Sequence, residues 1–288
     1  MTLEWSSSTH KRLFLLRSIP NSLRGVLGKA WQQHYEELYE PEADGAASLQ
    51  DALDKILKLF QNHNRTLSHL RYVWIALILV SAVEPTVRYY QPNSSIPGET
   101  FNRIAFWLLE TLEELLSSKM RFTQVSSEKE ATVIVDVCRL LTETKEIASF
   151  QVLPEALDVY SSAIKTLDYN QSLEALSDIL DDCLEGYAIF PGSYGRRELF
   201  DWWLLEVVPA SWYLFPPSSI YLVNELANEK SIALHQMDKL EKISSAIWSI
   251  ILIKSLRKEM SIRQKFSSTY DFFSNKIELN VKLEDSKL

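Results

Sequence analysis

The side chains with the clearest spacing for chemistry are four carboxylates in the stretch DILDDCLE, residues 178–185. Asp178, Asp181, Asp182 and Glu185 are spaced i, i+3, i+4 and i+7, so on a helix they share one stripe. Clustered carboxylate oxygens suit Mg²⁺, a hard cation that keeps some of its waters and can bridge to a diphosphate. The simpler interpretation is the solvent face of an amphipathic helix.

Within this stripe, Asp181, Asp182 and Glu185 read D-D-x-x-E. The motif resembles the aspartate-rich motif of the all-helical isoprenoid synthases. This resemblance implies a Mg²⁺-dependent helical enzyme that acts on a diphosphate substrate through these three carboxylates. The second metal-binding motif of that family is absent from the sequence, and the lysines and arginines are not grouped to hold a diphosphate. Such an enzyme is therefore kept as the alternative to a non-enzymatic function.

A second stretch whose residues could bind a ligand is GSYGRRELFDWW, residues 192–203. A glycine-containing loop before a helix can bind phosphate through free backbone N–H groups, and Arg196 and Arg197 would add positive charge. However, no hydrophobic strand precedes the loop, and the established glycine-rich phosphate motifs are absent. The sequence favours a tight turn that leads into a helix, with both arginines paired to carboxylates.

Aromatic side chains gather in the same region. Trp202 and Trp203 are adjacent, so on a helix they point about 100° apart and cannot both face one core layer. Tryptophan and arginine together are typical of interaction hot spots, although tryptophan also fills ordinary cores. We therefore predict a partner-binding surface within residues 186–217 that comprises Arg196, Arg197, Trp202, Trp203, Trp212 and Tyr213. A small-molecule or pigment binder that uses the aromatic cluster is a second alternative.

The composition indicates a globular helical protein. Of 288 residues, 46% are hydrophobic and 24% are charged, which is ordinary for a soluble domain. The chain has only seven glycines, which favours long helices over a sheet with many tight turns. A formal net charge of −8 argues against broad nucleic-acid binding, because that function needs a cationic surface.

The sequence predicts a cytoplasmic protein without a transmembrane segment. The longest apolar runs, 72–83 and 243–253, are shorter than the roughly 20 residues that span a bilayer. The first residues lack the order of basic and apolar side chains that marks a signal peptide. Cys138 and Cys183, the only cysteines, lie in apolar helical patterns and are interpreted as buried residues.

Apolar residues spaced by three and four positions predict helices along most of the chain. The expected helix caps are Asn21, Ser48, Thr66 or Ser68, and Asn170, and Gly186 is the expected stop of the helix that carries the carboxylates. The β-branched run 132–137 is ambiguous with a strand but fits a helix better. The C-terminal stretch 277–283 alternates apolar and polar side chains, as a strand does.

These patterns together predict an all-α fold, either a single irregular multi-helix bundle or a solenoid-like helical domain, with a short C-terminal strand or an extended tail. The helical domain is expected over residues 1–266 and the tail over 267–288, with a subdivision near 40–48 or 89–99 as the alternative. The preferred function is a non-enzymatic scaffold, adaptor or regulatory protein. It would bind a protein partner of unknown identity through residues 186–217 and would need no cofactor.

Overall fold

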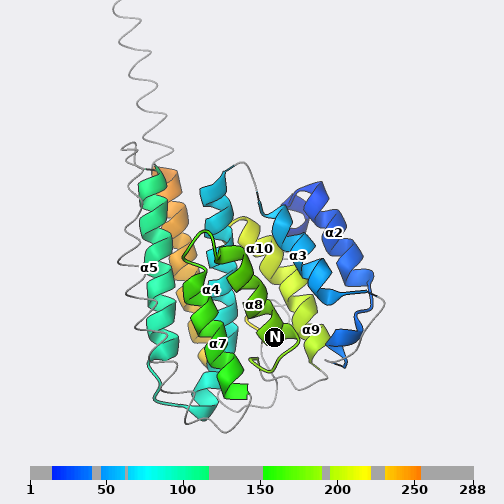
Figure 1. Cartoon of the computed structure of the whole chain (residues 1–288). Coiled ribbons are helices and arrows are strands. Elements are labelled where there is room, and N and C mark those ends of the chain that lie inside the picture. Colours follow the sequence, from blue (N-terminus) through cyan, green and yellow to red (C-terminus); the bar gives the residue numbers. More distant parts are fainter. Residues whose placement is uncertain are drawn as a thin grey trace, which may run out of the picture. The chain divides into compact units, whose positions relative to one another are not determined.

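The computed structural model has an all-α fold, so the predicted fold class is confirmed (Figure 1). The structure describes residues 15–40, 47–61, 64–116, 152–189, 195–221 and 231–253, and none of these residues forms a strand. The chain divides into two compact units, residues 1–245 and 246–288. The run 132–137, Cys138, the predicted boundary at residue 266 and the C-terminal tail lie outside the described residues, so those expectations stay predictions.

The first unit contains the helices α2 (Asn21–Gln32), α3 (Leu49–Leu59), α4 (Arg65–Tyr90), α5 (Ile96–Leu116), α7 (Val152–Lys165) and α8 (Ser172–Leu184). A short 3₁₀ helix, η1 (Glu36–Leu38), follows α2. After α8 come α9 (Arg196–Trp202), the π-helical segment η2 (Trp203–Val207) and α10 (Val208–Trp212), which run on without a break. Residues 231–245 are also helical, and in the second unit the described residues 246–253 are helical.

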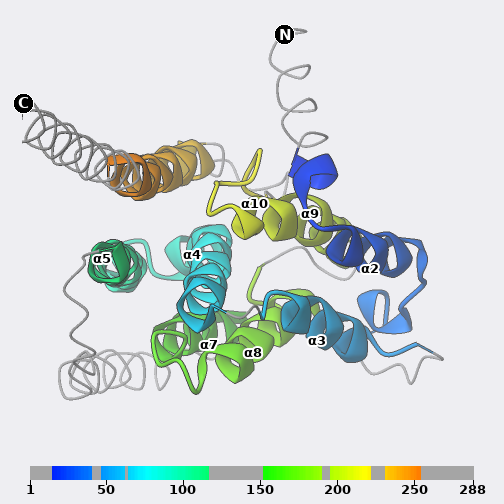
Figure 2. The same cartoon turned by 90° about the horizontal axis from the view of Figure 1, so that it is seen from above.

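The helix α4 is the core helix of the first unit. It contacts α5, α7, α8 and α10, and Figure 2 shows these helices around it. Every residue from Ser68 to Val87 is buried, as expected for a helix that is apolar on nearly all sides. Among the described residues, α4 is also the one helix long and apolar enough to cross a membrane, but 89% of its apolar window is buried inside the fold.

Two of the predicted helix starts have side-chain caps close to where they were expected. The predicted cap of α3 is confirmed, because Ser48 Oγ accepts a hydrogen bond from the Asp51 N–H at 3.1 Å. The predicted cap of α4 was wrong by a few residues. Asn64 Oδ1 accepts from the Leu67 N–H at 3.1 Å, and the helix therefore begins before Thr66.

The other two expected caps do not cap a helix. Asn21 is the first residue of α2, and Pro20 occupies the cap position without a side-chain hydrogen bond. Asn170 precedes the cap position of α8, which Gln171 fills, again without a side-chain bond. The Asn170 N–H instead donates to Asp168 Oδ1 at 2.9 Å, so this turn is organised by the aspartate.

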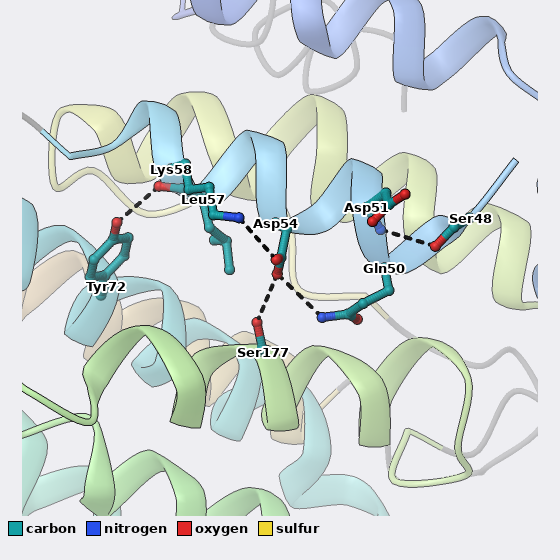
Figure 3. A network of polar contacts seen from close by, with 8 residues as sticks. All are labelled: Ser48, Gln50, Asp51, Asp54, Leu57, Lys58, Tyr72 and Ser177. Atoms are coloured by element: carbon teal, nitrogen blue, oxygen red, sulfur yellow. Dashed lines mark hydrogen bonds and ion pairs between the residues drawn. The ribbon is translucent and has the colours of Figure 1, made fainter.

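A polar network fastens α3 to two neighbouring helices (Figure 3). Ser177 of α8 donates its hydroxyl to Asp54 Oδ1 at 3.4 Å, and Lys58 pairs with the same aspartate at 3.2 Å. The hydroxyl of Tyr72, on α4, donates to the Leu57 carbonyl at 2.9 Å. These contacts fix α3 against both α4 and α8, and thereby also fix the surface that α3 forms with α2.

Candidate functional site

The six predicted partner-binding residues lie along α9, η2, α10 and the turn that follows, but they differ in exposure. Arg196 and Trp203 are 0% exposed and Trp202 is also buried, whereas Arg197, Trp212 and Tyr213 are half-buried. The structure therefore places three of the six side chains inside the fold. A partner that binds this segment would meet Arg197, Trp212 or Tyr213 first.

The two adjacent tryptophans have different neighbours, as their angular separation on a helix requires. Trp202 Nε1 donates to the Ser219 carbonyl at 2.8 Å, and its ring lies 6.0 Å from that of Tyr221. The Trp203 ring lies 6.2 Å from that of Phe200. Both rings thus pack against parts of the same unit.

Arg196 lies between α9 and the turn that follows α8. Its Nη2 donates to the Gly186 carbonyl at 3.3 Å, and its guanidinium lies 5.0 Å from the centre of the Tyr187 ring. Its Nε and Nη1 are buried and make no hydrogen bond to the described part of the chain. Arg196 therefore contributes to the order of the 185–189 turn, and its charge is not presented to solvent.

Arg197 joins α9 to the C-terminal end of α2. Its Nη1 donates to the Gln33 carbonyl at 3.0 Å and its Nη2 to the Trp31 carbonyl at 2.5 Å. Asp201, one turn later on α9, pairs with the guanidinium at 3.1 Å. Carbonyls at a helix C-terminus lack intrahelical partners and attract cations, so Arg197 stabilises the last turn of α2 in this position.

Exposed aromatic rings beside this junction were not among the predicted site residues. Trp31, at the end of α2, is 47% exposed, and Tyr39, just after η1, is 46% exposed. The His34 ring stacks on Tyr39 with centroids 4.9 Å apart and planes at 19°. The helical spacing gave no signal for this exposure, because Trp31 follows the buried Leu27 by four positions and so falls near the buried stripe of α2.

The predicted metal-binding residues are on α8 and its C-terminal end. Asp181 is exposed, and Asp182 and Glu185 are half-buried. Within the described ranges, no three His, Cys, Asp or Glu side chains are placed to hold a metal ion. The geometry therefore gives no support to the Mg²⁺ hypothesis for Asp181, Asp182 and Glu185.

Asp182 instead lies near carboxyls of α7 and α8 whose negative charges raise its pKa. Burial raises the pKa of Asp182 to about 7, and the charges of Asp158, Asp181 and Glu155 add to this rise. Although Asp181 as a whole residue is exposed, partial desolvation of its carboxyl raises its pKa, and the Asp178 charge adds to the rise. Burial also raises the pKa of Glu185, where the Arg196 charge opposes the rise.

We expect Asp182→Asn to stabilise the fold at pH 8 by about 1–2 kcal/mol, a figure reduced for solvent screening. The Asp182 pKa rises from 3.8 to about 7 on folding, so its ionised form costs stability as pH rises through this window. The neutral amide removes that cost, and its effect should vanish at pH 4. Urea unfolding at pH 4, 6 and 8 checks this. A gain in the free energy of unfolding that is the same at every pH, or a loss at pH 8, would contradict this expectation. The control is Glu174→Gln, on the exposed face of α8.

A cavity of about 510 Å³ lies between α2 and α3. Its wall consists of Asn21, Ser22, Gly25, Val26, Lys29, Ala30, Gln33 and Tyr35 from α2 and the residues after it, and of Ala47, Ser48, Asp51, Ala52 and Lys55 on the α3 side. None of the predicted site residues borders this cavity. The pigment-binding hypothesis, which used the 202–221 aromatic cluster, gains no support from it.

The described residues thus offer two features that the sequence patterns did not single out. One is the pair of exposed aromatic rings, Trp31 and Tyr39, near the C-terminal end of α2, and the other is the cavity between α2 and α3. Comparisons with protein-family models, with curated proteins and with solved structures find no match for this chain.

Proposed function

We propose that this chain is a non-enzymatic helical protein that binds a protein partner through Trp31, Tyr39 and Arg197, here called the α2–α9 surface. The supporting observation is that Trp31, whose carbonyl accepts a hydrogen bond from Arg197, is about half exposed, as is Tyr39, which stacks on His34. Tryptophan, tyrosine and arginine are the residues that most often dominate binding energy at protein interfaces. A cytoplasmic location remains a prediction from the sequence.

Contacts beneath the α2–α9 surface favour a preformed shape. Tyr35 is buried, and its ring meets that of Phe200 on α9 edge to face at 5.7 Å. Within η1, Glu37 Oε1 accepts a hydrogen bond from the Leu49 N–H at the start of α3, at 3.1 Å. A surface that is ordered before binding loses less conformational entropy when a partner arrives.

The predicted segment 186–217 contributes to this surface through Arg197. Its buried members have a different part in the proposal, because Arg196 packs on the 185–189 turn and Trp203 packs beside Phe200. They would support α9, and α9 in turn holds Arg197 against α2. Binding would therefore depend on Trp31 and Tyr39 directly, and on Arg196 and Trp203 only through the fold.

The proposal is tested by affinity capture from the native host with the wild-type chain and with Trp31→Ala and Tyr39→Ala as baits. We expect each substitution to reduce recovery of the specific partner at least tenfold, because an interface hot spot costs about 2 kcal/mol or more on truncation. Both variants should unfold at the wild-type urea concentration, since the side chains they remove are about half exposed.

The matched control is Phe106→Ala on α5, which removes a still more exposed aromatic ring, 67% exposed. This variant should recover the partner as the wild type does. Equal recovery by all four baits would contradict the proposed surface. Equal loss with Phe106→Ala would show a general effect of surface hydrophobicity.

A further inference from the structure

The cavity between α2 and α3 is an open groove. Its floor is apolar and buried or half-buried, made by Val26, Ala30, Tyr35, Ala47 and Ala52. Most of its other wall residues are polar and exposed, and on one side they run the length of α2, about 18 Å for 12 residues. A small-molecule site usually encloses most of its ligand, whereas an apolar trough with polar rims suits a helical peptide.

The charges on the groove suit an acidic occupant. Lys29 rises from α2 and Lys55 from α3, both are exposed, and neither makes an ion pair with the described residues. Asp51, in the first turn of α3, is the acidic residue of the wall. Carboxylates along a bound helix could therefore pair with a lysine on either side of the groove. Such pairing sets the orientation of the bound helix and raises its association rate.

At the C-terminal end of α2 the groove ends beside a residue that Arg197 binds. Gln33 and Tyr35 line its end, and the Gln33 carbonyl is an acceptor for Arg197. Figure 1 and Figure 2 both show α2 and α3 side by side, and the two helices are in contact. Trp31 is not a wall residue, and at 100° per residue it lies on a different side of α2 from Ser22, Val26 and Lys29, so a helix laid in the groove would bind a separate face of α2.

We propose that the α2–α3 groove receives an acidic amphipathic helix of the protein partner, with small apolar side chains on the groove floor and carboxylates beside Lys29 and Lys55. This inference rests on the proposed function, because it specifies which part of the partner is bound.

Two glycines of α2 provide a matched pair of variants. A Cβ at Gly25 or at Gly28 would meet no atom within 4 Å, and Gly25 lines the groove whereas Gly28 does not. Glutamine at either position is expected to raise the melting temperature to a similar extent, because glutamine favours the helix more than glycine does. Only Gly25→Gln places a new side chain in the groove.

The experiment is a selection of displayed random 16-residue peptides on the full-length chain. We expect the enriched peptides to be acidic and to carry apolar residues at i, i+3, i+4 and i+7. Binding of the enriched peptides should weaken about tenfold on Lys29→Glu/Lys55→Glu and on Gly25→Gln, remain unchanged on Gly28→Gln, and fall as salt is raised.

Enrichment of neutral or basic peptides, or equal binding to Gly25→Gln and Gly28→Gln, would overturn the inference. Light scattering gives a further check, since a dimer that Gly25→Gln dissociates would mean that a second copy of this chain fills the groove. The two proposals can fail separately. If capture from the host depends on Trp31 but not on Lys29 and Lys55, the groove proposal fails and the α2–α9 surface stands. If capture depends on Lys29 and Lys55 but not on Trp31, the α2–α9 surface fails and the groove proposal stands.

Discussion

Trp203→Ala is expected to lower the free energy of unfolding by about 3–5 kcal/mol, the usual cost of truncating a buried tryptophan. Trp203 is 0% exposed and is the first residue of the π-helical segment, so its removal leaves a cavity where α9 continues towards α10. Trp31→Ala, at an exposed position, should change stability by less than about 0.5 kcal/mol. Urea unfolding monitored by circular dichroism measures both changes.

The comparison of these two tryptophans decides between a binding role and a packing role. If Trp203→Ala kept wild-type stability and still lost the partner, Trp203 would belong to the interface and not to the core. If Trp31→Ala unfolded the protein, its exposed position would be wrong. Loss of partner with loss of fold in Trp203→Ala, and without loss of fold in Trp31→Ala, is the expected pattern.

Gly186→Ala is expected to destabilise the fold by about 3 kcal/mol, through overpacking and loss of a hydrogen bond. A Cβ at this position would lie 2.6 Å from the Asp182 carbonyl oxygen and 2.8 Å from Glu155 Oε2. The carbonyl oxygen accepts the Ala188 N–H at 3.1 Å, and Glu155 Oε2 accepts the Tyr187 N–H. Neither oxygen can retreat without giving up a bond that shapes the 185–189 turn.

The control for this substitution is Gly28→Ala on α2, where an added Cβ meets nothing within 4 Å. This change should stabilise the protein by about 0.5–1 kcal/mol, because alanine replaces glycine within a helix. Thermal or urea unfolding of the two variants gives the comparison. Similar effects of the two substitutions, in either direction, would show that the close contacts at Gly186 are absent in solution.

The residues that could be predicted from the sequence are those controlled by local patterns. The burial of α4 followed from its apolar run, the α3 cap from Ser48, and the end of α8 from Gly186. The reason for Gly186 was different from the expected one, because crowding by Asp182 and Glu155 excludes a side chain there. A local pattern can thus locate a helix end without revealing what requires the residue.

The features that were not predicted depend on contacts between distant segments. The bond from Arg197 to the Gln33 carbonyl spans 164 positions, so no local spacing indicates it. The pKa of Asp182 is raised by Asp158 and Glu155 on another helix, in addition to its own neighbours on α8. The exposure of Trp31 beside Arg197 likewise follows from how α9 meets α2.

The measurement that tests the central proposal most directly is hydroxyl-radical footprinting of Trp31 and Tyr39 in the free chain and in the chain captured with its partner. Both rings are about half exposed, so both should be oxidised readily in the free chain. The proposal predicts strong protection of both rings in the complex, with oxidation of Phe106 unchanged. Equal oxidation of Trp31 and Tyr39 in the free and bound chain would contradict it.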